Sequence, residues 1–189
     1  MLLQESQAEL IESCRAGDAE SFRALFEIYK DRVYTVALRY SGNPETAEDI
    51  AQDTFLKLFS AIRTFRGDST FEGWLYRLVV NACFDQKRRA RRFTPLLDLV
   101  AGLVRTPGKS ALDGVLMEER DAKIREAIGK LPPEQRIAVV LRYSQGLSYE
   151  EMAAILECPA GTIASRLNRA HSFLEKRLKR GLTEDQIHV

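Results

Sequence analysis

Several features that define other classes of protein are scarce or missing in this sequence. No apolar run approaches the roughly 20 residues that a membrane-spanning helix needs. The N-terminal stretch MLLQESQAELIESC turns polar too early for a secretory signal. We therefore expect a cytoplasmic protein without direct membrane insertion. We find no strand candidates and no internal repeat, so the expected fold class is all-α.

Cysteine and histidine are also scarce. The three cysteines (Cys14, Cys83 and Cys158) are widely spaced, and the two histidines (His171 and His188) lie near the C-terminus. Neither set has the spacing of metal ligands or of a disulfide framework. We interpret the cysteines as reduced packing residues, and we expect no metal, no cofactor and no catalytic residue.

The net charge is only +1, but the charges are unevenly distributed. Five cations lie between Lys87 and Arg92, and from Ala160 to Arg180 there are six Lys or Arg against one acid, Glu175. Between Glu45 and Asp53 there are four acids and no base. This distribution predicts two surfaces for anionic partners and one for a basic partner.

The first part of the chain has the periodicity of amphipathic helices. Asp18 is a candidate N-cap for a helix that ends at Gly42, and Asn43-Pro44 begins the next helix. A third helix from Phe71 runs into the basic cluster. The second of these helices should bury one face, formed by Ala47, Ile50, Ala51, Thr54, Phe55, Leu58, Phe59 and Ile62.

The pattern dissolves further along the chain, where Pro95, Gly102, Pro107, Gly108 and Gly114 interrupt it. We therefore predict two small helical domains joined by a flexible linker. The expected boundaries are a first domain over residues 1–93, a linker over 94–115, a second domain over 116–181 and a tail over 182–189.

The second domain contains a helix-turn-helix pattern. Ser148 is placed to cap a short helix, Glu157 to Gly161 form a turn, and Thr162 is placed to cap the last helix. An ordinary surface helix with a solvated face is the alternative, but this segment is poor in acids. We therefore expect it to contact phosphates and base edges in a DNA major groove. The candidate contacts on the last helix are Thr162, Ser165, Arg166, Asn168 and Arg169.

The predicted helix from Glu45 to Ile62 carries an acidic stripe opposite its buried face. The stripe consists of Glu45, Glu48, Asp49, Gln52 and Asp53, with Leu56 one turn further on. The candidate contacts with a partner are Glu48, Asp49, Gln52, Asp53 and Leu56. Such a surface suits a basic, partly apolar protein partner, although solvation alone also accounts for it. A di-metal carboxylate site needs Glu-x-x-His pairs, and no histidine lies near this helix.

A third candidate surface combines a loop, aromatic residues and cations. This combination is typical of proteins that bind single-stranded nucleic acid. Trp74 shares a face with Leu75 and Leu78, which favours a place in the core rather than a stacking role. The candidate contacts are Arg66, Gly67, Asp68, Ser69, Asn81, Lys87, Arg88 and Arg91.

Taken in order, these segments resemble the sigma-70 family, in particular its small extracytoplasmic-function group. The segments that carry the resemblance are Asp49 to Phe55, Phe65 to Arg77 with Asn81 and Asp85, Leu131 to Arg136, Leu147 to Glu151, and Gly161 to Ala170. They resemble the core-polymerase-binding segment, the −10-element reader and the −35-binding domain of the family. The short linker is similar to that of the group, which lacks the intermediate domain of larger members.

The resemblance implies a function and its partners. The chain would direct core RNA polymerase to promoters, with the acidic stripe docked on a coiled coil of the largest subunit. The first domain, a region 2-like bundle, would trap an unstacked base of the −10 element, and the region 4-like second domain would bind the −35 element. The family also implies an anti-sigma factor, often membrane-anchored, that holds the protein inactive until a stress signal.

Two other functions remain as alternatives. A stand-alone helix-turn-helix regulator would use residues 131–180 and leave the acidic stripe without a role. An enzyme such as a nuclease would need a carboxylate pocket with a nearby base or a Cys/His cluster, and the sequence offers neither.

Overall fold

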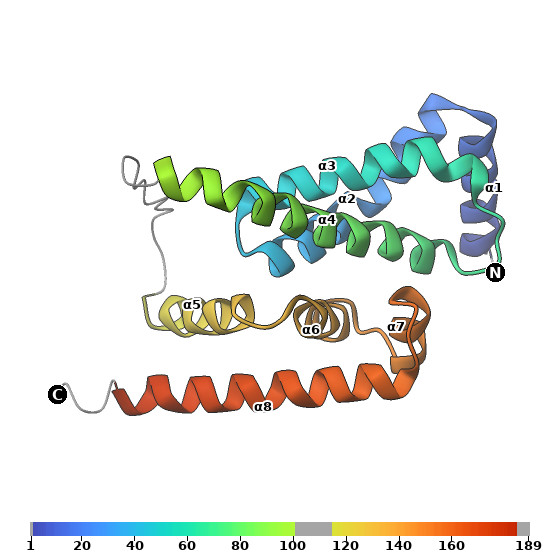
Figure 1. Cartoon of the computed structure of the whole chain (residues 1–189). Helices are drawn as coiled ribbons and strands as arrows, with labels where there is room; N and C mark the ends of the chain where they lie inside the picture. The colour runs from blue at the N-terminus through green and yellow to red at the C-terminus, as the bar shows by residue number, and fades with distance from the viewer. Residues whose placement is uncertain (1, 101–114, 185–189) are drawn as a thin grey trace.

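The computed structural model describes the backbone of residues 2–100 and 115–184, and the side chains of residues 7–86 and 122–179. Every regular element in these ranges is helical, which confirms the expected fold class. The first domain contains α1 (Leu2–Ala16), α2 (Ala19–Ser41), α3 (Pro44–Ala61), the short 3-10 helix η1 (Ile62–Thr64) and α4 (Phe71–Val100). The second contains α5 (Val115–Gly129), α6 (Pro133–Gln145), α7 (Tyr149–Ile155) and α8 (Ala160–Glu184) (Figure 1).

Local signals determine most helix ends. The Asp18 carboxylate accepts a hydrogen bond from the Ser21 amide at 2.8 Å, and the Asn43 side chain accepts one from the Thr46 amide at 2.8 Å. Between these caps, Gly42 ends α2 in the left-handed conformation, with φ 72°. In the second domain, Ser148 and Glu151 form a reciprocal capping box at the start of α7.

The start of α8 corrects one prediction. The last helix begins at Ala160, so Thr162 lies inside its first turn and is not the N-cap. The Pro159 carbonyl accepts hydrogen bonds from the Thr162 amide at 2.8 Å and the Ile163 amide at 3.3 Å. Because the fixed φ of proline suits helix entry, the chain turns into the helix earlier than the position of the threonine suggests.

Two further helical segments differ from the sequence-based expectation. Helix α1 was not predicted, yet Ile11 and Cys14 on it are buried in the core. Helix α4 continues to Val100, beyond residue 93, where we placed the end of the first domain. Residues 101–114, most of the predicted linker, lie outside the described residues. The domain boundaries therefore stay a prediction.

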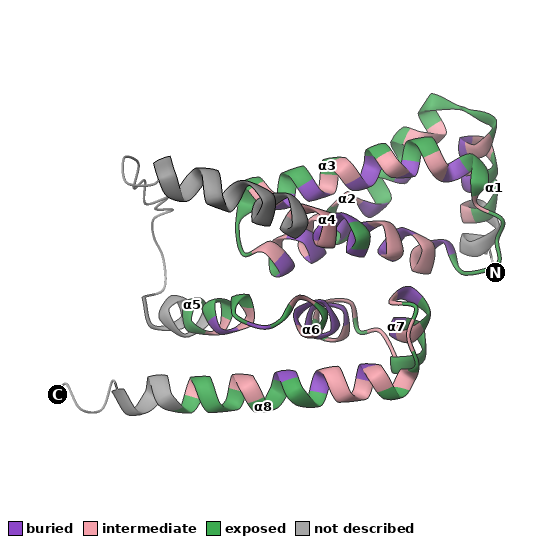
Figure 2. Cartoon of the chain, viewed as in Figure 1, coloured by how far each residue is buried: buried purple, intermediate pink, exposed green. Residues whose placement is uncertain are grey.

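The two domains pack against each other, with α6 in contact with α2 and α7 in contact with α4 (Figure 1). The Tyr76 hydroxyl donates to Gln145 Oε1 at 2.7 Å. The Arg77 guanidinium donates to the Ala154 carbonyl at 2.9 Å and lies 3.2 Å from the Glu157 carboxylate. Buried side chains of both domains form one apolar cluster, and Figure 2 shows buried positions on helices of both domains. The described structure is therefore a closed arrangement of the two domains.

Candidate protein and nucleic-acid interfaces

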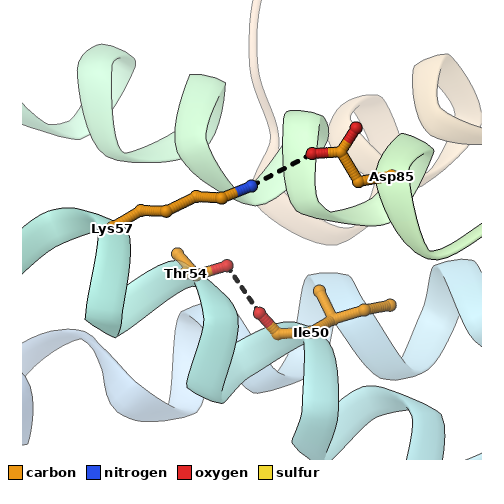
Figure 3. A network of polar contacts seen from close by, with 4 residues as sticks. All are labelled: Ile50, Thr54, Lys57 and Asp85. Carbon is orange, nitrogen blue, oxygen red and sulfur yellow. Dashed lines mark hydrogen bonds and ion pairs between the residues drawn. The ribbon is translucent and has the colours of Figure 1, made fainter.

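Helix α3 carries the acidic stripe on its solvent side. Glu45, Glu48, Asp49 and Gln52 are exposed and Asp53 is partly exposed, while Ala47, Ile50, Thr54 and Leu58 are buried on the opposite side. Thr54 is accommodated in the core because its hydroxyl donates to the Ile50 carbonyl at 2.7 Å (Figure 3). The stripe therefore presents carboxylates to solvent on a helix whose other face is fixed by packing.

The C-terminal half of the same surface is apolar. Leu56 is 61% exposed and Phe59 is 63% exposed, although the sequence predicted that Phe59 is buried. Phe59 packs edge-on against Phe22 of α2, with ring centroids 5.0 Å apart. It lies at the edge of the apolar face, where helical spacing alone does not show how far the neighbouring helix reaches. The acidic stripe is thus followed by an exposed apolar patch, Leu56 and Phe59, of the kind that protein partners cover.

The loop before α4 and the exposed side of α4 form the second candidate surface. Arg66, Gly67, Asp68 and Ser69 are all exposed between η1 and α4, and Asn81 is exposed on α4. Near Asn81, the Lys57 ammonium of α3 lies 3.1 Å from the Asp85 carboxylate (Figure 3). The side chains of Lys87, Arg88 and Arg91 lie outside the described residues.

Trp74 belongs to an aromatic cluster at the start of α4. Its ring centroid lies 5.2 Å from that of Phe65 and 5.9 Å from that of Phe71. Phe71 is buried, and Trp74 is half-buried against the core. The structure therefore confirms that Trp74 is a packing residue. The cluster holds the first turn of α4 in place beside the exposed loop.

A buried polar network ties the same turn to α1 and α2. The Tyr29 hydroxyl donates to Glu72 Oε1 at 2.7 Å, and the Gln7 amide donates to the same oxygen at 2.8 Å. Burial acts to raise the pKa of Glu72, but the hydrogen bonds from Gln7 and Tyr29 and the charge of Arg32 together hold that pKa below its ordinary value. The carboxylate is therefore stabilised in its ionised form.

The network predicts a pH-dependent effect of Tyr29→Phe. Loss of a hydrogen bond to a charged group should lower the free energy of unfolding by roughly 1.5–3 kcal/mol at pH 7. Because the folded-state pKa of Glu72 is lowered, this contribution is present above the ordinary pKa of a glutamate and is lost as the pH falls through the folded-state value. Urea unfolding of both chains should therefore give a difference that shrinks in acid. A difference that is constant or that grows toward low pH would contradict the role of the carboxylate.

Helices α7 and α8 form the third candidate surface. Asn168 and Arg169 are exposed on α8, and Thr162 and Ser165 are partly exposed at its N-terminal end. Arg166 is also only partly exposed, and one of its nitrogens lies 3.6 Å from the Cys158 sulfur in the turn. Arg169 is therefore the more freely presented of the two arginines. Exposed Tyr143 of α6 adds a residue that the sequence did not indicate, and its hydroxyl is 2.8 Å from His171 Nε2.

Cys14 and Cys83 are buried in the core of the first domain. Burial raises the pKa of the Cys83 thiol to about 12, and burial followed by the charge of Asp18 raises the pKa of the Cys14 thiol. In the part of the chain with described side chains, no group of three His, Cys, Asp or Glu residues could hold a metal ion. Nor does any described helix have the length and apolar character needed to cross a membrane.

Comparison with known proteins places both domains in one family. Residues 25–93 match the family model of sigma-70 region 2, and residues 121–174 match that of sigma-70 region 4. The chain is 34% identical over 192 residues to the RNA polymerase sigma-H factor of Pseudomonas aeruginosa, a match that covers 97% of the chain and 100% of the relative. It is 35% identical to the ECF RNA polymerase sigma factor SigW of Bacillus subtilis, over 89% of the chain and 95% of the relative.

Solved structures agree with this placement. The sigma factor RpoE of Bartonella quintana, in complex with the anti-sigma factor NepR, is 28% identical to the chain and superposes with a TM-score of 0.66. That match covers 85% of the chain and 98% of the solved structure. CnrH in complex with the cytosolic domain of CnrY has the same fold, with a TM-score of 0.67 over 90% of the chain and 96% of the solved structure, at 23% identity.

Proposed function

The chain belongs to the extracytoplasmic-function group of the sigma-70 family, and we propose that separate surfaces on it bind core RNA polymerase and promoter DNA. It directs core RNA polymerase to promoters and recognises their −10 and −35 elements. We assign no catalytic step to the chain. The observation that carries the assignment is the presence on one chain of the exposed acidic face of α3, the exposed Asn81 side of α4 and the exposed N-terminal half of α8.

The acidic stripe of α3, with its apolar continuation at Leu56 and Phe59, is the proposed contact for core polymerase. A basic coiled coil of the largest subunit complements both parts of this surface. The carboxylates attract it, and the exposed Leu56 and Phe59 side chains supply the apolar area that gives an interface its affinity. The proposal is tested by the charge reversal described in the Discussion.

Asn81 and the loop of Arg66, Gly67, Asp68 and Ser69 are proposed to read the opened −10 strand. An exposed amide on a rigid helix can hydrogen-bond the edge of an unstacked base. Unstacking a base costs a few kcal/mol, so capture should require polymerase to hold the DNA. Lys87, Arg88 and Arg91 are proposed to follow the phosphates of the same strand.

Asn81→Ala should therefore lower open-complex formation without weakening the binding of core polymerase. The loss should be largest on duplex promoters, where capture of the base has to offset unstacking. Permanganate footprinting on a duplex promoter measures opening, and the affinity of the polymerase complex for a pre-opened bubble template measures base capture without the cost of unstacking. A suitable control is Arg23→Ala, which removes an exposed side chain on α2. If Asn81→Ala opens the duplex promoter and binds the bubble template like wild type, the base-reading role is wrong.

Helix α8 is proposed to enter the major groove at the −35 element. Arg169, which is exposed, is the stronger candidate for a base edge, and the partly exposed Arg166 is the stronger candidate for a phosphate. Arg169→Ala should then cost roughly 1–3 kcal/mol and relax preference at one base pair. Arg166→Ala should weaken all sequences about equally and reduce the salt slope by about one unit.

DNA selection with the full chain and core polymerase separates these two effects. The control is Arg23→Ala on α2, which removes an exposed cation far from α8 along the chain. If both Arg166→Ala and Arg169→Ala leave −35 affinity and base preference unchanged, the helix does not enter the groove as proposed.

The closed arrangement of the domains cannot be the one that reads both promoter elements. Positions −10 and −35 are separated by about 25 base pairs, or about 85 Å of B-DNA at 3.4 Å per base pair. In the closed chain, Arg77 of α4 lies 3.2 Å from Glu157 in the turn before α8. Even α8, with its 25 residues, is only about 38 Å long. The domains must therefore separate when both elements are bound.

This requirement supports control by an anti-sigma factor. A partner that holds the two domains together would block promoter binding without covering every DNA contact. The solved relatives named above are bound to anti-sigma factors or to a cytosolic partner domain. We propose that an anti-sigma factor, soluble or anchored at the membrane, stabilises the closed arrangement of this cytoplasmic protein.

A further inference from the structure

One ion pair connects the two surfaces that the proposed function uses. Lys57 lies four residues after Asp53 on α3, and Asp85 lies four residues after Asn81 on α4. Residues four apart on a helix are neighbours on its surface. The pair therefore joins the end of the acidic stripe to the turn that follows Asn81, across the line where α3 and α4 pack together (Figure 3).

The Lys57–Asp85 ion pair is a directional interaction between α3 and α4, whose interface is otherwise apolar in its core. Ile50 and Leu58 of α3 and Ala82 and Cys83 of α4 are buried in the same apolar cluster. Apolar burial depends on area and is not directional. The ion pair holds the Lys57 nitrogen 3.1 Å from an Asp85 carboxylate oxygen and so joins one fixed position on α3 to one on α4. It therefore limits sliding and rotation of α4 against α3.

The Lys57–Asp85 ion pair should contribute little to the stability of the fold. The side chains of Lys57 and Asp85 are 40% and 41% exposed, and ion pairs with that exposure contribute little to folding free energy. Orientation is a more demanding requirement, because a binding constellation has to be held within about 0.5 Å of its productive geometry. Asn81 is exposed on one side of α4, so its direction depends on how α4 is seated on α3.

We propose that Lys57 and Asp85 are positioning residues that hold Asn81 in register with the polymerase-bound α3. The inference rests on the proposed functions of α3 and Asn81. It assigns a role to two residues that are not among the proposed contacts with polymerase or with the captured base. When α3 docks on polymerase, the pair keeps α4 fixed relative to α3. Asn81 then contacts the unstacked base in one orientation.

A different role for the same pair makes an opposite prediction. If Lys57 only neutralised a carboxylate that otherwise repels the DNA strand, Asp85→Asn would improve promoter opening. If the pair positions α4, Asp85→Asn should impair opening as Lys57→Met does. The sign of the Asp85→Asn effect therefore distinguishes positioning from shielding.

The test is a double-mutant cycle on open-complex formation with core polymerase and a duplex promoter. Lys57→Met and Asp85→Asn should each lower the opening rate about fivefold, the factor that corresponds to roughly 1 kcal/mol, the upper range for an exposed pair. The double variant should be no slower than Asp85→Asn alone, because Lys57→Met has no ion pair with Asp85 left to remove once that carboxylate is neutralised. Affinity for core polymerase and the thermal midpoint of the free chain should stay at the wild-type values, and Lys57→Arg should recover most of the loss.

Two controls make failures distinguishable. Lys30→Met removes an exposed ion pair with Glu27 that lies within α2 and should open promoters like wild type. Asn81→Ala, measured in the same series, reports on the proposed function. If Asn81→Ala is defective but Lys57→Met or Asp85→Asn matches wild type or opens faster, the positioning role is wrong and the base-reading role stands. Losses that multiply in the double variant would also overturn the positioning role, and a wild-type Asn81→Ala would overturn the proposed function itself.

Discussion

Reversing two charges on α3 (Asp49→Arg with Asp53→Arg) should abolish co-purification of the chain with core RNA polymerase. Asp49 is exposed and Asp53 is partly exposed, so the fold should tolerate the change. The substitutions place two arginines opposite the basic surface that the wild-type carboxylates are proposed to contact. Like charges facing each other across an interface cost several kcal/mol. We therefore expect a loss of affinity of at least about a hundredfold, the factor that corresponds to roughly 3 kcal/mol.

A matched control reverses two exposed acids elsewhere in the first domain. Glu20→Arg with Glu27→Arg changes the net charge by the same amount on α2 and breaks only local pairs with Arg23 and Lys30. This control should bind core polymerase like wild type at physiological salt. Binding that survives the α3 reversal, or that is lost equally in the control, would show that the acidic stripe is not the polymerase contact.

Removal of the buried guanidinium of Arg136 (Arg136→Met) should cause a large loss of stability. Arg136 is only 9% exposed, and it donates to the Gly129 carbonyl, to the Leu131 carbonyl at 3.2 Å and to the Tyr40 carbonyl at 3.1 Å. Its guanidinium also lies over the Tyr40 ring, 5.4 Å from the centroid. Methionine fills similar space but leaves these carbonyl groups without a donor, at a cost of roughly 3 kcal/mol in the free energy of unfolding.

Urea unfolding at pH 7 measures this loss, with the exposed Arg23→Met as the control. The loss in free energy of unfolding for Arg136→Lys should lie between those of Arg136→Met and Arg23→Met. Lysine keeps the charge, but its single ammonium cannot donate to several carbonyls as a planar guanidinium does. Because the Tyr40 carbonyl belongs to the first domain, Arg136→Met should also weaken the closed arrangement. A loss below about 1 kcal/mol would mean that water replaces the guanidinium at these carbonyls.

Features that depend on neighbouring residues could be predicted from the sequence. The Asn43 and Ser148 caps follow from side chains that bond amides three residues away, and Gly42 ends α2 because it can adopt a positive φ. The same local reasoning failed at Thr162, because the helix begins at Ala160, directly after Pro159. It also failed for Phe59, because the reach of α2 over α3, and not helical spacing, decides which edge residues are covered.

Contacts between distant residues could not be predicted in this way. Arg136 and the Tyr40 carbonyl are 96 residues apart in the sequence, and Lys57 and Asp85 are 28 residues apart. The spacing of apolar residues along the helices does not reveal either contact. The candidate interface residues could be named because the exposed faces of α3 and α8 have unusual charge, whereas their assignment to polymerase and promoter elements came from resemblance to the family.

Run-off transcription with core polymerase and genomic DNA tests the central claim most directly. Core polymerase with the chain should start transcription at a limited set of sites whose upstream sequences share one −10 and one −35 element at constant spacing. Core polymerase with the chain carrying Asp49→Arg and Asp53→Arg should not use these sites. Start sites that are the same with and without the chain would contradict the assignment of this protein as a sigma factor.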